Sequence, residues 1–175
     1  KWKGQISLET EEYQWFYHVM QLMGRDKGLD FMRKFARQDL QMRKGHTLLA
    51  QLVAAGESAL ATVVYSNRVE RMKASGAPID WVRFKGPTIT AINAIAIPDK
   101  APHGNAARLF VDFVLSREGQ SLLRGLRRIP ARSDVAPDPP SLTQGLTLYP
   151  ARPEGMIENF NDTVTRFDEI FNRAR

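Results

Sequence analysis

Short apolar runs alternate with amphipathic segments along this chain, and this alternation restricts its fold more than any other feature. Residues 5–8 alternate polar and apolar side chains, as a half-buried strand does. Residues 59–64 form a run of small, mostly apolar side chains, which is typical of a strand covered on both faces. Between these runs, apolar residues recur at intervals of three and four, the period of a helix. The chain is therefore predicted to have an α/β fold.

Capping residues and periodicity predict the limits of individual elements. Thr10 is expected to cap the first helix, with Glu11 and Glu12 in its first turn. Ser116 is expected to cap a short helix that ends near residue 125. Further helices are expected from about residue 26 and at residues 48–56, 66–75 and 103–115. Further strands are expected at residues 79–84 and 88–97.

The C-terminal part of the chain is expected to be an extended connection followed by a long helix. Residues 136–153 contain five prolines, too many for a helix or a central strand, so a surface connection is predicted. The helix that follows has an apolar stripe, which we expect in a core or an interface: Phe160, Val164, Phe167 and Phe171. The helix at residues 103–115 is expected to turn four side chains inward: Ala106, Leu109, Phe110 and Phe113.

Composition excludes several classes of protein. No run of 18 apolar residues is present in the sequence, so no transmembrane helix is predicted. The sequence contains no cysteine, and a disulfide framework, a thiolate metal site or a cysteine nucleophile is therefore excluded. The chain starts at Lys1 without a signal sequence, and the expectation is that a segment before it has been removed.

The positive charge of the chain does not indicate nucleic-acid binding. The formal net charge is +6, but the basic residues form scattered pairs with carboxylates between them. Examples are the pairs at residues 33–34, 43–44 and 127–128. A nucleic-acid interface is instead typically a basic stripe interleaved with aromatic side chains. We therefore expect no nucleic-acid partner, although the charge suits anionic ligands.

No catalytic or metal-binding motif is recognisable. His18, His46 and His103 do not have the spacing of a zinc site, so no metal is predicted. His18 lies in an aromatic-rich helix, where a structural or surface role is expected, and His103 is expected to be exposed. The sequence contains no Gly-x-Ser-x-Gly elbow, phosphate loop or dinucleotide fingerprint. A binding protein without a cofactor is thus favoured over an enzyme.

Residues Gly45, His46 and Thr47 are a candidate site for an anion. Thr47 is the expected N-cap of the helix at residues 48–56, so the three residues lie at a helix start. Unpaired backbone N–H groups at a helix start can bind an anion or a ligand oxygen.

Three stretches of the sequence resemble one known family. Residues 1–8 (KWKGQISL) resemble a strand found midway through ferric-iron-type extracellular substrate-binding proteins. Residues 45–57 (GHTLLAQLVAAGE), with the apolar run after them, resemble the helix and strand that lead to the ligand in that family. The most specific similarity lies in residues 94–120 (AIAIPDKAPHGNAARLFVDFVLSREGQ) and 129–135 (IPARSDV).

The resemblance implies a periplasmic-binding-protein-like fold of type II, with two α/β lobes that close on a ligand. By this similarity, residues 1–86 belong to the second lobe, and residues 87–135 return to the first. Residues 136–175 are then the Pro-rich connection and a C-terminal helix that packs on the second lobe. The two-lobe architecture is expected to be incomplete here, which is compatible with an oligomer. The family further implies a periplasmic location, an inner-membrane ABC permease as partner and a small-molecule solute as cargo.

The expected solute contacts follow from the same resemblance. Ferric-binding relatives have two adjacent tyrosines after the strand that corresponds to residues 59–64, whereas this chain has Tyr65, Ser66 and Asn67. A single phenol, protonated until about pH 10, is a poor Fe³⁺ site, so a polar or anionic solute is preferred. Tyr65 is expected to stack or hydrogen-bond, and Ser66 and Asn67 to donate. The alternative is structural: Ser66 and Thr47 as helix caps, and Tyr65 at a strand end.

Two other functions remain open on the sequence alone. The first is an effector-binding regulatory domain of a transcription factor, because such domains use a similar two-lobe fold. The second is a hydrolase or transferase whose catalytic residues are dispersed along the chain and meet only in space.

Overall fold

The centre of the molecule is a three-stranded parallel sheet. The computed structural model describes residues 1–172. The strands are β1 (Ile6–Glu9), β2 (Gln41–Arg43) and β3 (Leu60–Ala61), in the order β2-β1-β3. Both outer strands run parallel to β1, with Ser7 opposite Gln41 on one side and opposite Ala61 on the other. The predicted α/β fold class is confirmed, although the third strand is shorter than the run at residues 59–64.

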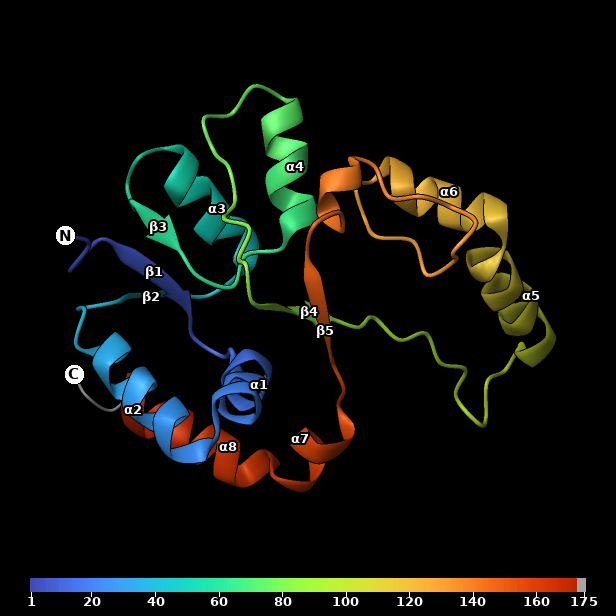
Figure 1. The fold of residues 1–175 in the computed structure, drawn as a ribbon. Coiled ribbons are helices and arrows are strands. Elements are labelled where there is room, and N and C mark those ends of the chain that lie inside the picture. Colours follow the sequence, from blue (N-terminus) through green and yellow to red (C-terminus); the bar gives the residue numbers. More distant parts are fainter. Residues whose placement is uncertain (173–175) are drawn as a thin grey trace.

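Helices cover both faces of this sheet (Figure 1). On one side lie α1 (Tyr13–Met23), α2 (Arg25–Ala36) and α8 (Phe160–Phe167), and on the other α3 (His46–Ala54) and α4 (Ser66–Ala74). The C-terminal helix thus contacts α1, although about 140 residues separate them in the chain. One apolar cluster includes residues of the sheet and packs against α1, α2 and α8, and a second lies between α3 and α4.

The larger cluster joins the start of the chain to its end. Leu8, Phe16 and Phe167 are almost fully buried in it, and the rings of Phe16 and Phe167 meet edge to face with centroids 5.7 Å apart. Phe171 is also buried there, in a π-helical turn at Asp168–Asn172. The C-terminal apolar stripe was predicted to form a core or an interface, and Phe167 and Phe171 are in the core. Phe160, of the same stripe, is 46% exposed.

The predicted long C-terminal helix is divided. A short helix, α7 (Glu154–Glu158), precedes α8, and Asn159 lies between them with φ −109° and ψ 17°. The side-chain amide of Asn159 donates to the carbonyl oxygen of Gly155 at 2.8 Å, and its own carbonyl oxygen accepts from the amide of Thr163. The residue therefore ends one helix and begins the next, which periodicity alone did not indicate.

The predicted strand at residues 79–84 is wrong. Ile79, its first residue, packs with Ala50 and Val69 in the second apolar cluster. The segment pairs with no strand within residues 1–172. Side chains attach it to α4 instead: the indole of Trp81 donates to Oε1 of the buried Glu70 at 2.6 Å. An apolar run can be held by side-chain contacts as well as by a sheet, and its pattern does not distinguish the two.

The Pro-rich region also differs from its prediction. It contains a 3-10 turn at Pro140–Leu142 and a strand, β5 (Thr147–Ala151), where only a connection was expected. β5 pairs in parallel with β4 (Pro87–Ala91), a strand shorter than the predicted 88–97. Pro150 is tolerated because each strand of a two-stranded sheet has a free edge.

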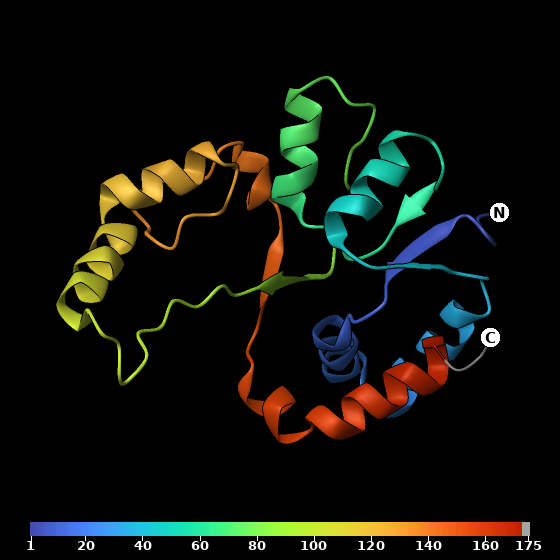
Figure 2. The ribbon, with the colours of Figure 1, turned by 180° about the vertical axis from the view of Figure 1, so that it is seen from behind.

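Beyond β4 and β5 lie two helices that stand apart from the three-stranded sheet (Figure 2). They are α5 (Gly104–Leu115) and α6 (Arg117–Gly125). The predicted Ser116 cap is confirmed, since its hydroxyl accepts from the amide of Gly119 at 3.1 Å. The predicted inward face of α5 is wrong: Leu109 is 72% exposed and Phe110 59%. Periodicity specifies which face a helix would bury but not whether the described residues supply a partner for it.

Candidate functional site

The carboxyl ends of the three parallel strands meet at one edge of the central sheet. Glu9 ends β1 and residues 10–12 follow it, residues 45–47 follow β2, and residues 65–67 follow β3. The strand order β2-β1-β3 means that the chain moves from β1 to one neighbour and then crosses to the other side. Ligands of open α/β sheets bind at such a switch point, outside the carboxyl ends of the strands.

His46 and Tyr65, two of the residues that the sequence indicated, are in contact at this edge. Their ring centroids are 4.4 Å apart with the planes tilted by 54°. His46 Nδ1 donates to the carbonyl oxygen of Val63 at 2.8 Å, and Nε2 lies 3.0 Å from Oε1 of Glu12. The bond to Glu12 is the main reason why the pKa of His46 is raised, and partial burial opposes it. The arrangement favours a protonated ring.

Tyr65 is the most accessible of these aromatic groups. Its side chain is about half exposed, and it occupies the N-cap position of α4. Burial of the rest of the ring raises the pKa of the Tyr65 phenol, and the carboxylates of Glu12 and Glu9 add to this. The positive charge of Arg128 acts in the opposite direction and lowers the pKa of the phenol. The phenol is a neutral hydrogen-bonding group at physiological pH.

Ser66 and Asn67 are the first two residues of α4 and are partly buried. The helix has Tyr65 at its N-cap, and no side chain caps it. The structural alternative of Ser66 as a helix cap therefore does not hold. Both side chains remain at the start of the helix that follows β3, on the same edge as His46.

The start of α3 differs from its prediction. Gly45, with φ +105°, is the N-cap, and the helix begins at His46, so the expected cap role of Thr47 is wrong. Thr47 lies in the first turn and is exposed. The amide of Gly45 donates to Oε1 of Glu9 at 3.2 Å. One of the N–H groups expected to receive an anion is thus already bonded to a carboxylate of the chain.

The predicted Thr10 cap of the first helix is likewise wrong. α1 begins at Tyr13, with Glu12 at the N-cap and no side-chain cap bond. Thr10 and the two residues after it instead continue the loop from β1, where Glu9 accepts a hydrogen bond from the amide of Glu11. This longer loop is what brings Glu12 to His46.

Glu9, Glu12 and Arg128 are site residues that the sequence reasoning missed. Glu12 was interpreted as a carboxylate that complements a helix dipole, and Arg128 as half of a surface pair. A signal for the two glutamates was present, because they directly follow the first predicted strand and a parallel sheet gathers such residues at one edge.

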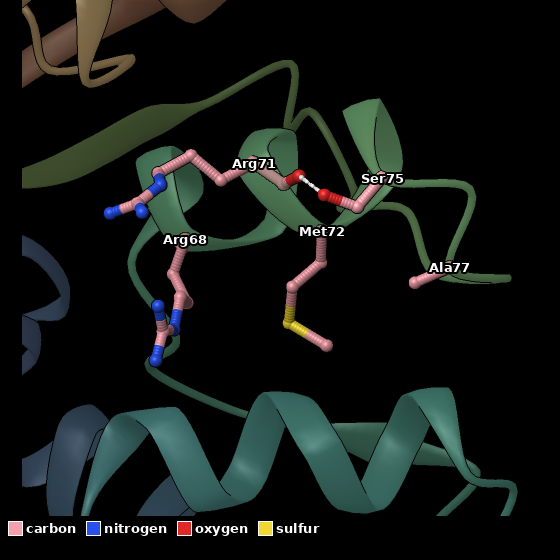
Figure 3. Close-up of a pocket in the computed structure, with 5 residues that line it drawn as sticks. All are labelled: Arg68, Arg71, Met72, Ser75 and Ala77. Atoms are coloured by element: carbon pink, nitrogen blue, oxygen red, sulfur yellow. Dashed lines mark hydrogen bonds between the residues drawn. The ribbon is translucent and has the colours of Figure 1, made fainter.

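A shallow hollow of about 220 Å³ lies on α4, outside these residues (Figure 3). It is lined by Arg68, Arg71, Met72, Ser75 and Ala77. Figure 3 shows Arg68 extending from α4 toward α3, while the hydroxyl of Ser75 donates to the carbonyl oxygen of Arg71 at 3.2 Å. Within residues 1–172, Nε of Arg68 is buried without a hydrogen-bond partner.

The described residues contain neither a metal-binding cluster nor a membrane-spanning helix. Among residues 1–172, no group of three or more His, Asp or Glu side chains is placed to hold a metal ion. In the same part of the chain, no helix has the length and apolarity needed to cross a membrane.

Comparison with known proteins now gives the family. Residues 13–125 match the family model described as bacterial extracellular solute-binding protein, over more than half of the chain. A search of curated proteins found no match. A crystal structure of the substrate-binding protein of an ABC transporter from Agrobacterium tumefaciens is similar, with a TM-score of 0.68 and 17% sequence identity. The alignment covers 93% of this chain and 55% of that protein, so this chain spans about half of its length. The expected periplasmic-binding-protein-like fold is confirmed, and the chain belongs to the family of bacterial extracellular solute-binding proteins.

Proposed function

We propose that this chain is the solute-binding component of a bacterial ABC importer, and that it captures a small polar or anionic solute. The observation that carries the proposal is the meeting of His46 and Tyr65 at the switch point of the sheet. The solute would contact the phenol of Tyr65 and the side chains of Ser66 and Asn67, beside the helix start at residues 45–47.

The charges around the site support an anionic solute. The two carboxylates are already engaged, Glu9 with backbone amides and Glu12 with His46. Arg68, next to Asn67, has a buried Nε without a partner in the described part of the chain. Guanidinium groups bind carboxylate and phosphate with paired hydrogen bonds. The guanidinium of Arg68 therefore favours an oxyanion.

A ferric ion is less well supported. Binding of Fe³⁺ by tyrosine needs the ionised phenolate, whereas the pKa of Tyr65 is raised by burial and by neighbouring carboxylates. Ser66 and Asn67 occupy the positions where the tyrosine pair of iron-type relatives is expected. The family model that matches names a solute and not a metal.

The same proposal includes a periplasmic location, delivery to an inner-membrane permease and no enzymatic activity. It also keeps the division into lobes, with residues 1–86 and 136–175 in one lobe and residues 87–135 in the other. The exposed apolar face of α5 supports this division, since the rest of the first lobe would cover it. Closure of two lobes on the solute would create the form that the permease recognises.

A thermal-shift screen of the full-length protein tests the proposal. Phosphonates, carboxylates, sulfate, sugars, polyamines and Fe³⁺ would be compared, because a ligand that binds only the native state raises its stability. We expect an anion to raise the melting temperature, and Tyr65→Phe to reduce the shift. Tyr149→Phe, the same change at a partly buried tyrosine on β5, is the matched control.

Two results would count against the proposal. A ligand whose thermal shift is equal in the wild type, in Tyr65→Phe and in a Ser66→Ala, Asn67→Ala double variant does not use this edge. An Fe³⁺ complex with a tyrosinate absorption band that disappears in Tyr65→Phe would replace the anionic solute by iron.

A further inference from the structure

His46 links all three strand ends of the candidate site. It follows β2, its Nε2 lies 3.0 Å from Glu12 after β1, and its Nδ1 lies 2.8 Å from the carbonyl oxygen of Val63 after β3. A carbonyl oxygen and an ionised carboxylate both only accept hydrogen bonds, so both ring nitrogens need a proton to make both bonds. The imidazolium is the form that satisfies this geometry.

This linkage is shielded from water. The side chains of His46 and Glu12 are only 22% and 12% exposed. Salt and water screen a partly buried, hydrogen-bonded charge pair less than a surface pair, and removal of one of its two partners costs more. The Lys44–Glu11 pair nearby shows the contrast, since its side chains are 74% and 53% exposed.

His46 also fixes the segment that leads to Tyr65. Val63 has a φ of 60°, a strained conformation that a β-branched residue rarely adopts. The bond from His46 to the Val63 carbonyl is a contact that holds the backbone in this conformation, two residues before Tyr65. The ring of His46 then packs on the ring of Tyr65.

We propose that Glu12 is a positioning residue, which through protonated His46 holds Tyr65 in its binding orientation. The relevance of this to solute binding rests on the proposed function, in which Tyr65 contacts the solute. The groups that face His46 are the carboxylates of Glu12 and Glu9 and the phenol of Tyr65, and the charge of Arg128 also acts on that phenol. When His46 loses its proton, the bond from Nε2 to Glu12 is lost and Tyr65 becomes free to reorient.

Nuclear magnetic resonance on the full chain, labelled with ¹³C in the tyrosine rings, tests this without a solute. The Tyr65 resonance is assigned with Tyr65→Phe, and the titration of His46 is followed in the same samples. We expect both signals to change with one midpoint, above the ordinary pKa of histidine. Glu12→Gln should lower that midpoint, whereas Glu11→Gln, which removes the same charge from the adjacent exposed carboxylate, should change it far less.

The proposal is overturned if the Tyr65 resonance does not follow His46, or if Glu11→Gln lowers the midpoint as much as Glu12→Gln. Should Glu12→Gln fail to fold, His46→Gln serves instead, and the Tyr65 resonance should then show no titration in this range.

Binding of sulfate, whose charge is constant over this range, separates the two proposals. If Tyr65→Phe abolishes sulfate binding but Tyr65 does not follow His46, the positioning role fails and the proposed function stands. If Tyr65 follows His46 but neither sulfate nor any compound of the screen binds, the proposed function fails and the positioning role stands.

Discussion

The backbone amide of Gly45 donates a hydrogen bond to Oε1 of Glu9 at 3.2 Å, so a carboxylate of the chain lies at the amino end of α3. The second oxygen of Glu9 accepts from the amide of Glu11, and the side chain is buried. Glu9 therefore joins the end of β1 to the end of β2. The carboxylate supports the shape of the candidate site and is not itself free for a ligand.

Replacement of Glu9 should destabilise the protein. Glu9→Gln keeps the shape of the side chain but turns one acceptor into a donor, which then faces a backbone N–H. We expect a loss of about 1–3 kcal/mol in the free energy of unfolding, measured with urea, because a partly buried backbone amide loses its partner. Glu57→Gln, the same change at an exposed position, should alter it by less than about 0.5 kcal/mol. Equal losses in the two variants would contradict the structural role of Glu9.

The stability of the protein should depend on pH through His46. Its pKa is raised in the folded state, mainly by the hydrogen bond with Glu12. The stabilisation is therefore fully present below the unfolded-state pKa and is lost as pH rises through the folded-state pKa. Urea unfolding of the wild type and of His46→Gln at about pH 5.5 and about pH 8.5, which bracket the ordinary range of histidine, measures this. The wild type should lose its advantage over the variant at the higher pH, and an advantage that grows with pH would contradict the assignment.

The C-terminal helix should be essential to the core of the N-terminal part. Phe167 is fully buried and contacts the rings of Phe16 and Phe171, with centroids 5.7 Å and 4.9 Å away. Phe167→Ala should cost about 3–5 kcal/mol of unfolding free energy in thermal or urea denaturation. Phe160→Ala, at a half-exposed position of the same helix, is the control and should cost much less. Similar costs would mean that α8 does not pack as described.

The segment at residues 79–84 should depend on the indole of Trp81. Trp81→Phe removes the donor to Glu70, whose buried carboxylate then keeps only the weaker contacts with Lys73 (3.8 Å) and Arg83 (3.5 Å). We expect a loss of about 1–3 kcal/mol in unfolding free energy. Trp2→Phe, at a position that is 40% exposed, is the matched control. A larger effect at Trp2 would argue against this attachment.

Local signals predicted the elements whose stabilising contacts are near in the chain. The helix at residues 66–75 and the cap at Ser116 were indicated by spacing and by a capping residue, and both are confirmed. The prediction of a strand at residues 79–84 was wrong because Trp81 in this segment bonds to Glu70, a side chain on the preceding helix, and not to a neighbouring strand. β5 was missed because its five residues include a proline, and only pairing with the distant β4 makes them a strand.

For the candidate site too, the sequence indicated individual residues but not the contacts between them. Gly45, His46, Thr47, Tyr65, Ser66 and Asn67 were selected from the sequence, and their role in binding stays a prediction. The sequence by itself determined that the chain is α/β, because the period of its apolar residues depends only on neighbours within a few turns. Only the tertiary structure decided that Glu12, His46 and Tyr65 meet, because parallel pairing brings together the ends of β1, β2 and β3, which are spread over about 50 residues of the chain. That meeting depends on the strand order, which no local pattern contains.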